Sequence, residues 1–194
     1  MRLLYIFDMG GVMASDCQVV PAILKTLGIA IGDFIDYAGD GLDELQIGKV
    51  TSAQFWERFS LGYGKPVAED LWARFFQPEL HQEMVDLIIC LKNEHRVVCG
   101  TNTIDAHYDI HAGRGDYRHF ERVYASNRIG LAKPDADFYR YILQQEGYTA
   151  ENSVFIDDRA QNVQAARQVG IKALLFVDVE SLLSLLEKDG PAIE

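Results

Sequence analysis

The part of the sequence after His81 alternates short apolar runs with helical patterns, and this alternation is the strongest constraint on the fold. Four runs have the length and composition of buried strands: residues 96–102, 123–126, 153–158 and 172–177. Between them, apolar residues recur at intervals of three and four positions, as in amphipathic helices. Strands joined by such helices form right-handed crossovers in a parallel sheet. The sequence therefore predicts an α/β protein with a doubly wound parallel sheet.

Another apolar run, residues 3–7, ends at Asp8 and is followed by Gly10 and Gly11. An apolar run that stops at a carboxylate and two glycines predicts a buried strand entering a turn. Ligands collect at the carboxyl ends of parallel strands, because loops and helix N-termini bring amide donors there. We therefore expect Asp8 at the ligand-binding edge of the sheet. An aspartate before a glycine is also the usual cap of a simple turn.

The stretch that follows the first strand is predicted to be helical. Apolar residues have helical spacing over residues 20–27, and Thr51 to Gln54 has the form of a capping box. Six aromatic residues lie at helical spacing, and we expect them to fill the core of a small bundle: Phe55, Trp56, Phe59, Trp72, Phe75 and Phe76.

These patterns divide the chain into two predicted domains. Residues 1–15 and 81–194 form an α/β core, and residues 16–80 form a helical cap inserted after the first strand. The cap is expected to select the substrate, through polar residues 43–46 or the turn at residues 16–18.

Polar residues follow the ends of the predicted strands. They are Asp8, Thr101, Asn102, Lys133, Asp157 and Asp158. In a parallel sheet, these residues meet at one edge. This set suits phosphoryl transfer, because the transferred group carries dispersed negative charge and needs cations and donors around its oxygens. A Mg²⁺ ion held by hard oxygen ligands would let a carboxylate approach an anionic substrate.

Four segments resemble, in order, the motifs of the haloacid dehalogenase-like (HAD) hydrolase superfamily: residues 7–12 (Phe-Asp-Met-Gly-Gly-Val), Thr101-Asn102, Lys133-Pro134-Asp135, and residues 155–158 (Phe-Ile-Asp-Asp) followed by Asn162. The helical insertion resembles the C1-type cap of that family. Each motif alone is weak, but four in order cover nearly the whole chain. Within the superfamily, the chain looks most like bacterial α-D-glucose-1-phosphate phosphatases, which also have glycine two residues after the nucleophile and share the run at residues 95–98.

The resemblance implies a catalytic role for four residues. Asp8 would attack phosphorus and form an aspartyl-phosphate that water hydrolyses. The Thr101 hydroxyl and the main-chain amide of Asn102 would bind phosphoryl oxygens, and Lys133 would neutralise the phosphoryl group and steady Asp8. Structural interpretations remain open, since Thr101 and Asn102 are also typical helix caps and Lys133 is also an ordinary loop residue.

The resemblance also implies a Mg²⁺ site. Its ligands would be Asp8, the main-chain carbonyl of Gly10 and Asp158, with Asp157 binding directly or through a water. Asn162 would orient these ligands from one helical turn away. As an alternative, Asp157 and Asp158 have the pattern of a simple N-terminal helix cap.

Gly10 departs from the family pattern, which usually has a second aspartate there as general acid and base. Three explanations remain open. The substrate has a good leaving group, such as the anomeric oxygen of a sugar 1-phosphate; the cap or a water supplies the proton; or the protein binds phosphorylated ligands with little catalysis.

We therefore predict a magnesium-dependent phosphatase, a phosphoric monoester hydrolase that acts on a small phosphorylated metabolite such as a sugar phosphate. One alternative is a haloacid dehalogenase, but that reaction needs no metal and has little use for the pair Asp157 and Asp158. Another is a non-catalytic protein that binds phosphorylated ligands. His107, His111 and His119 are expected in one loop, where His107 is a weaker candidate for substrate contact.

The composition limits the kinds of molecule that the protein is expected to bind. The sequence has 29 acidic and 18 basic residues and a net charge of −11, and such a surface repels nucleic acids and anionic membranes. The three cysteines, Cys17, Cys90 and Cys99, are an odd number and do not indicate a disulfide framework. Cys90 and Cys99 are expected to be buried reduced thiols. Because the N-terminal apolar run is brief, no signal peptide is expected, and a cytoplasmic protein is favoured. The sequence does not fix the oligomeric state; a monomer is favoured.

Overall fold

Five parallel strands form the central sheet of the computed structural model, which describes residues 2–189. Their order across the sheet is β5, β4, β1, β6, β7. Their bounds are Leu4–Phe7 (β1), Arg96–Thr101 (β4), Val123–Ala125 (β5), Ser153–Asp157 (β6) and Lys172–Leu175 (β7). In the central register, Phe7 lies between Cys99 and Ile156. The predicted α/β class, with a doubly wound parallel sheet, is confirmed.

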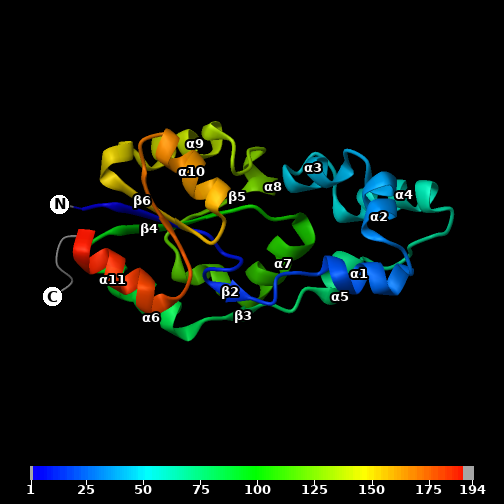
Figure 1. The fold of residues 1–194 in the computed structure, drawn as a ribbon, viewed down its shortest axis with the longest axis horizontal. Coiled ribbons are helices and arrows are strands. Elements are labelled where there is room, and N and C mark those ends of the chain that lie inside the picture. Colours follow the sequence, from blue (N-terminus) through cyan, green and yellow to red (C-terminus); the bar gives the residue numbers. More distant parts are fainter. Residues whose placement is uncertain (1, 190–194) are drawn as a thin grey trace.

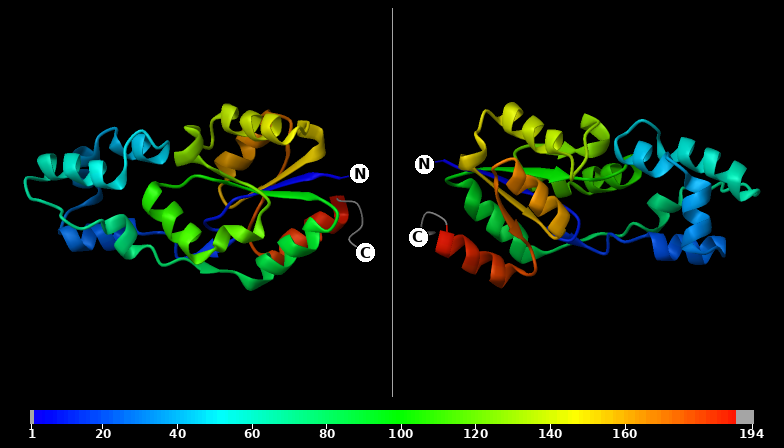
Figure 2. Two further views of the ribbon diagram at one scale, coloured as in Figure 1. Left: turned by 180° about the vertical axis from the view of Figure 1, so that it is seen from behind. Right: turned by 45° about the horizontal axis from the view of Figure 1, so that its top comes forward.

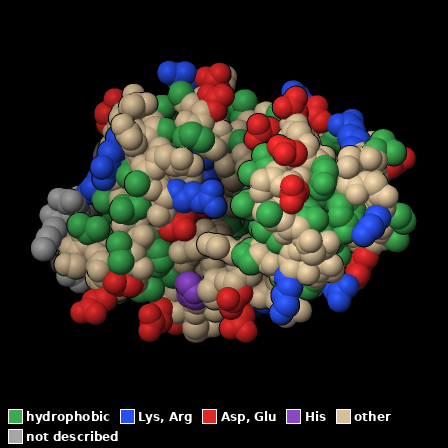
Figure 3. All heavy atoms as spheres, turned by 45° about the vertical axis from the view of Figure 1, so that its right-hand side comes forward, with side chains coloured by type: hydrophobic (Ala, Val, Ile, Leu, Met, Phe, Trp, Pro, Cys, Tyr) green, Lys and Arg blue, Asp and Glu red, His purple; other side chains and the backbone are tan. Residues whose placement is uncertain are grey.

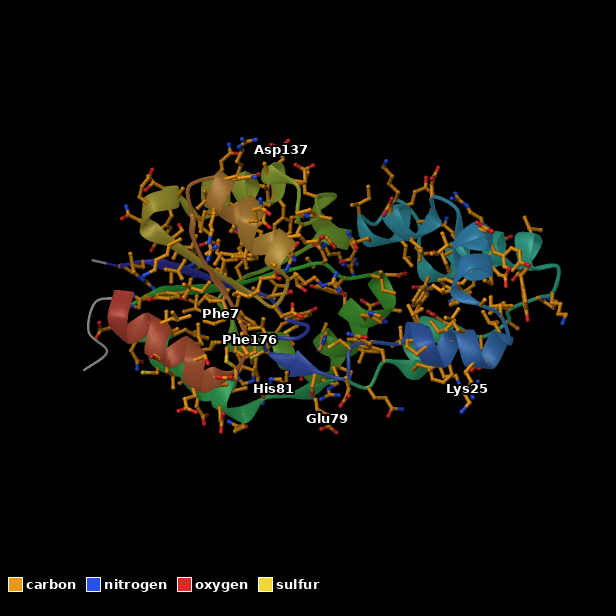
Figure 4. The ribbon with its side chains drawn as sticks, in the orientation of Figure 1. Phe7, Lys25, Glu79, His81, Asp137 and Phe176 are labelled. Carbon is orange, nitrogen blue, oxygen red and sulfur yellow. The ribbon has the colours of Figure 1, made fainter. Side chains whose placement is uncertain are left out.

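Two pairs of helices cover the sheet, one pair on each face (Figures 1 and 2): α9 (Ala136–Glu146) with α10 (Ala160–Gln168), and α6 (Gln82–Lys92) with α11 (Val179–Asp189). Alternate residues of β1 serve the two faces, as the two-residue period of a strand requires. Leu4 and Ile6 join the cluster under α9 and α10, whereas Tyr5 and Phe7 join the cluster under α6 and α11. Phe176, which follows β7, belongs to the same cluster as Phe7 (Figure 4). Both faces of β1 are thus buried, which explains its continuous apolar run.

Five helices form the cap, which lies beyond the carboxyl ends of the strands (Figure 1): α1 (Val20–Leu27), α2 (Ile31–Ala38), α3 (Gly41–Gln46), α4 (Ser52–Tyr63) and α5 (Leu71–Phe75). The predicted capping box begins α4. The Thr51 amide donates to Gln54 Oε1 at 2.9 Å, and the Gln54 amide donates to Thr51 Oγ1 at 3.3 Å. The predicted aromatic core is also confirmed, with five of the six rings buried and Phe75 partly buried.

A short antiparallel strand pair connects the core to the cap. β2 (Ala14–Ser15) pairs with β3 (Glu79–Leu80), so the chain enters and leaves the cap side by side. The sequence-based limits of residues 1–15, 16–80 and 81–194 fall at this pair, and we propose the domain boundary there.

Hydrogen bonds at two places join the cap to the core at a distance from the connecting strands. Ser126 Oγ donates to the carbonyl oxygen of Gln46 at 2.7 Å, and the Ser52 amide donates to Asp105 Oδ2 at 2.9 Å. The second bond gives the N-terminus of α4 a carboxylate partner from the core. Together they hold the cap over the carboxyl ends of the strands.

Two sequence-based expectations are wrong. The segment with His107, His111 and His119 is not a loop but forms α7 (Asp105–Arg114) and the 3-10 helix η1 (Asp116–His119). The pattern was missed because the fully buried residue of α7 is the polar His111. Cys90 is exposed, because the apolar residues of α6 at helical spacing face the sheet and leave Cys90 outside.

The remaining short elements are α8 (Ser126–Ile129) and the 3-10 helix η2 (Ala150–Asn152). Over residues 2–189, none of the helices combines the length and the apolar character needed to cross a bilayer.

Candidate active site

A cavity of about 270 Å³ lies where the carboxyl ends of the strands meet the cap, and Figure 3 shows the molecule hollowed between these two parts. Six of the seven predicted site residues line it: Asp8, Gly10, Thr101, Asn102, Lys133 and Asp158. The seventh, Asp157, is fully buried beside them. Residues separated by up to 150 positions thus converge on one site, as parallel topology predicts.

Lys133 is the centre of the polar network. Its Nζ lies 2.9 Å from Asp8 Oδ1 and 2.8 Å from Asp157 Oδ2, and it donates to the carbonyl oxygen of Gly100 at 2.9 Å. These three acceptors match the three protons of an ammonium group. A buried cation is stable only when it is paired in this way. Lys133 therefore fixes the Asp8 carboxylate, while its contact with a phosphoryl group stays a prediction.

The ionisation of Asp8 reflects two opposed effects. Burial raises the pKa of Asp8 to about 6, and the positive charge of Lys133 limits the rise. Burial alone would lower the pKa of Lys133, but the charges of Asp8 and Asp157 outweigh it and raise that pKa. At neutral pH the pair is therefore ionised, and Asp8 is a carboxylate.

Asn102 positions the Lys133 segment with its side chain. The Lys133 amide donates to Asn102 Oδ1 at 2.8 Å, and Asn102 Nδ2 donates to the carbonyl oxygen of Lys133 at 2.8 Å. The Lys133–Pro134 peptide bond is cis. This reciprocal pair gives Asn102 a structural function that the motif did not suggest. The predicted role of its main-chain amide, like that of the buried Thr101 hydroxyl, stays a prediction.

Asp157 has its oxygen atoms occupied by protein donors. Oδ1 accepts from the Arg159 amide at 2.8 Å, Oδ2 from Lys133, and both from Asn162 Nδ2 at 3.0 Å. Asp157 was expected to bind the metal either directly or through a water. Because its oxygen atoms already accept hydrogen bonds from the protein, this arrangement favours binding through a water. Asn162, predicted to act from behind the ligands, holds Asp157 in place.

Asp158 is the exposed carboxylate of the site, and its approach to the first motif depends on glycine. Gly11 has a φ of +80°, in the left-handed region, and a Cβ atom at this position would overlap the Asp158 carboxylate. Burial and the charge of Asp157 raise the pKa of Asp158. Glycine at position 11 thus lets the two motifs come together.

The site fits a divalent cation. Asp8, Asp157 and Asp158 each present an oxygen atom, and these atoms lie within 4.8 Å of one another. In addition, the buried Oδ1 of Asn162 lines the cavity and has no hydrogen-bond partner among the described residues, as expected for a group that faces a hydrated ion. Hard oxygen donors of this kind suit Mg²⁺. The Gly10 carbonyl, also at the cavity, stays a predicted ligand.

The cavity is also lined by residues that the sequence did not single out as site residues. Phe76, His111 and Tyr117 line it together with His107, the weaker candidate named above. The His107 ring stacks on Phe76 with centroids 3.8 Å apart and an interplanar angle of 10°. The spacing of His107 and His111 could have indicated that both face the site, because residues four apart lie on the same side of a helix. This spacing is informative only once the segment is known to be helical.

His107 should make the protein less stable in acid. Burial lowers its pKa from 6.5 to about 4, so between these pH values the unfolded chain binds a proton that the folded chain does not. Stability contributed by neutral His107 is therefore complete above pH 6.5 and falls as the pH drops toward 4. We expect the wild type to lose about 3 kcal/mol more than His107→Gln between pH 7 and pH 4, measured by urea denaturation. Parallel stability curves for the two proteins would contradict this assignment.

Comparison with known proteins places the chain in a family. The profile of haloacid dehalogenase-like hydrolases matches residues 4–170. The chain is 30% identical over 191 residues to the sesquiterpene phosphatase astK of Aspergillus oryzae, an alignment that covers 94% of this chain and 92% of the relative. It is 22% identical over 184 residues to D-ribitol-5-phosphate phosphatase of Bacteroides thetaiotaomicron, covering 86% and 88%.

A solved structure shares the fold. A HAD family enzyme of Bacteroides thetaiotaomicron, in complex with magnesium and inorganic phosphate, superimposes with a TM-score of 0.77 at 22% identity, covering 94% of this chain and 99% of that chain. Fold and site thus define a hydrolase with a helical cap over a doubly wound core. The chain belongs to the haloacid dehalogenase-like hydrolase family. The predicted superfamily and the predicted enzyme class, a phosphoric monoester hydrolase, are confirmed. The carboxylate cluster, together with the magnesium-bound neighbour, supports the expected Mg²⁺ cofactor.

Proposed function

We propose that the protein is a magnesium-dependent phosphatase that hydrolyses a small phosphorylated metabolite, such as a sugar phosphate, through an aspartyl-phosphate on Asp8. The observation that carries the proposal is the position of Asp8 at the cavity, held 2.9 Å from the buried Lys133 and beside Asp157 and Asp158. A carboxylate that is buried, ionised and fixed next to a cation is suited to attack phosphorus.

Each oxygen of Asp8 has its own role in the proposed reaction. Oδ1 accepts from the Met9 amide at 2.7 Å and from Lys133, which leaves Oδ2 for the attack. A bond forms between Oδ2 and phosphorus while the ester bond breaks, and the leaving oxygen takes its proton from water. Water then attacks phosphorus, which releases inorganic phosphate and restores Asp8. Mg²⁺, held by Asp8, Asp158 and the Gly10 carbonyl, would neutralise charge on the phosphoryl oxygens.

Removing the metal is expected to abolish turnover reversibly. Dialysis against EDTA should reduce hydrolysis of p-nitrophenyl phosphate to the background rate, and added Mg²⁺ should restore it. Asp158→Asn should raise the Mg²⁺ concentration needed for half-maximal activity by about 10- to 100-fold, because one anionic oxygen ligand is lost. Full activity in EDTA would contradict a metal-dependent reaction.

A substrate screen with and without Mg²⁺ tests the proposal against the two alternatives. Release of inorganic phosphate only in the presence of Mg²⁺ supports the phosphatase. Release of chloride from 2-chloropropionate in EDTA, without phosphate release from any ester, would instead support a dehalogenase. Ligand binding without turnover of any phosphate ester would support a binding protein.

The screen should include anomeric and non-anomeric sugar phosphates. The glycine at position 10, one of the features by which the sequence resembles α-D-glucose-1-phosphate phosphatases, favours an anomeric leaving group, which needs less protonation than an ordinary alcohol. A sugar 1-phosphate is therefore the proposed substrate type, and faster cleavage of glucose 1-phosphate than of glucose 6-phosphate is the result expected.

A further inference from the structure

Some residues that line the cavity have buried polar atoms without protein partners. Over residues 2–189, five buried side-chain nitrogen and oxygen atoms have no hydrogen-bond partner, and three of them belong to residues that line the cavity: Asn162 Oδ1, His107 Nε2 and Tyr117 Oη. Asn162 belongs with the carboxylates, as described above. The other two come from α7 and η1, and no step of the proposed phosphoryl chemistry uses them. Because buried polar groups are nearly always paired, these two atoms indicate a ligand.

His107 is a rigid, neutral hydrogen-bonding group. Its ring is stacked on Phe76 and makes an edge contact with Trp72 at 6.4 Å between centroids. Burial lowers its pKa to about 4, so at neutral pH the ring has one N–H donor and one acceptor nitrogen. A hydrogen bond with the backbone of Trp72 opposes this lowering of the pKa. Because Nε2 has no protein partner, Nδ1 is the donor in that bond and Nε2 is left to accept a hydrogen bond from a hydroxyl. The neutral ring gives no charge to attract a second anionic group.

Tyr117 is also held in place and neutral. Its ring packs on His111 and on Tyr108, and His111 is itself fixed by Asp116 at 2.8 Å. Burial raises the pKa of Tyr117, and the charge of Asp8 adds to the rise, which places this phenol within the electrostatic reach of the nucleophile. Tyr117 therefore brings a fixed, neutral phenol to the cavity.

We propose that His107 and Tyr117 are specificity-determining residues that bind hydroxyl groups of an uncharged, polyhydroxylated leaving group, with Phe76 as the apolar wall of the subsite. This inference rests on the proposed function and names the part of the substrate that the subsite accepts. Two fixed neutral hydrogen-bonding groups beside an aromatic face suit a carbon chain that carries hydroxyls.

The test compares two esters that differ only in their hydroxyl groups, ribitol 5-phosphate and n-pentyl phosphate, with Mg²⁺ present. The wild type should have the higher kcat/KM for ribitol 5-phosphate. Tyr117→Phe and His107→Phe, which keep the aromatic rings, should each reduce the ratio of the two kcat/KM values by about five- to ten-fold. His107→Gln, which returns an amide near the position of Nε2, should recover part of the loss. Tyr108→Phe is the matched control on α7 and should leave the ratio as in the wild type, because Tyr108 does not line the cavity.

The outcomes separate this inference from the proposed function. If the wild type cleaves p-nitrophenyl phosphate but shows no preference for ribitol 5-phosphate, or prefers farnesyl phosphate, the subsite is wrong and the phosphatase stands. If Tyr117→Phe and His107→Phe reduce activity on both esters equally, their role is structural and the inference is overturned. If the wild type hydrolyses no phosphate ester with Mg²⁺, both conclusions fail.

Discussion

Replacing Asp8 with asparagine is expected to abolish phosphatase activity while the fold is retained. Asparagine has nearly the same shape but cannot form the acyl-phosphate bond, so kcat for p-nitrophenyl phosphate should fall at least about 10⁴-fold, as for other lost nucleophiles. The fold should tolerate the change, because Lys133 keeps Asp157 and the Gly100 carbonyl as partners. Burial disfavours the charge of Asp8 in any case. Steady-state kinetics and thermal unfolding measure the two effects.

The matched control for Asp8→Asn is Asp137→Asn. Asp137 is exposed on α9 (Figure 4), where it pairs with Arg140 at 3.0 Å, and it does not line the cavity. This variant should retain activity within about two-fold, since an exposed pair of this kind contributes little. A folded Asp8→Asn protein with a tenth or more of the wild-type activity would show that Asp8 is not the nucleophile.

The sequence was sufficient to predict the sheet and the convergence of the site. Apolar runs such as residues 153–157 report burial directly, and parallel topology brings the strand ends together whatever the side chains are. The aromatic core of the cap could also be predicted, because aromatic residues at helical spacing lie on one face of a helix and are usually buried together. These features depend on periodicity, which a single sequence contains.

The features of the site that could not be predicted from the sequence depend on contacts between distant segments. The reciprocal pairing of Asn102 with Lys133 joins residues 31 positions apart, and no local pattern announces it. Tyr117 was not considered, because its place at the cavity depends on how η1 packs against α6 and α7. α7 was missed because its fully buried residue is His111, so the segment resembles an exposed polar segment when only hydropathy is considered.

The second large effect is expected at Gly10, where the family usually has an aspartate. The structure leaves room for a side chain there. The φ of Gly10 is outside the left-handed region, and a Cβ atom would meet only Cys17, with Sγ at 3.5 Å and Cβ at 3.6 Å, which is ordinary contact. Glycine at this position is therefore not required by the backbone, and its effect is on the chemistry. The missing group is the acid that would protonate the leaving oxygen and the base that would activate water.

Gly10→Asp is therefore expected to be a gain-of-function variant. General acid–base catalysis contributes about 10²- to 10⁴-fold, so kcat/KM for glucose 6-phosphate, an ordinary alkyl ester, should rise by up to that amount. The rise for glucose 1-phosphate should be much smaller, because its anomeric oxygen leaves with less protonation. Gly10→Asn, which has the same shape without the ionisable proton, should give no gain. Gly11→Asp should be inactive, because its side chain would overlap Asp158 at a positive φ. Equal activity of the wild type and Gly10→Asp on both esters would show that another group already supplies the proton. The absence of an aspartate at position 10 would then give no reason to expect a substrate with a good leaving group.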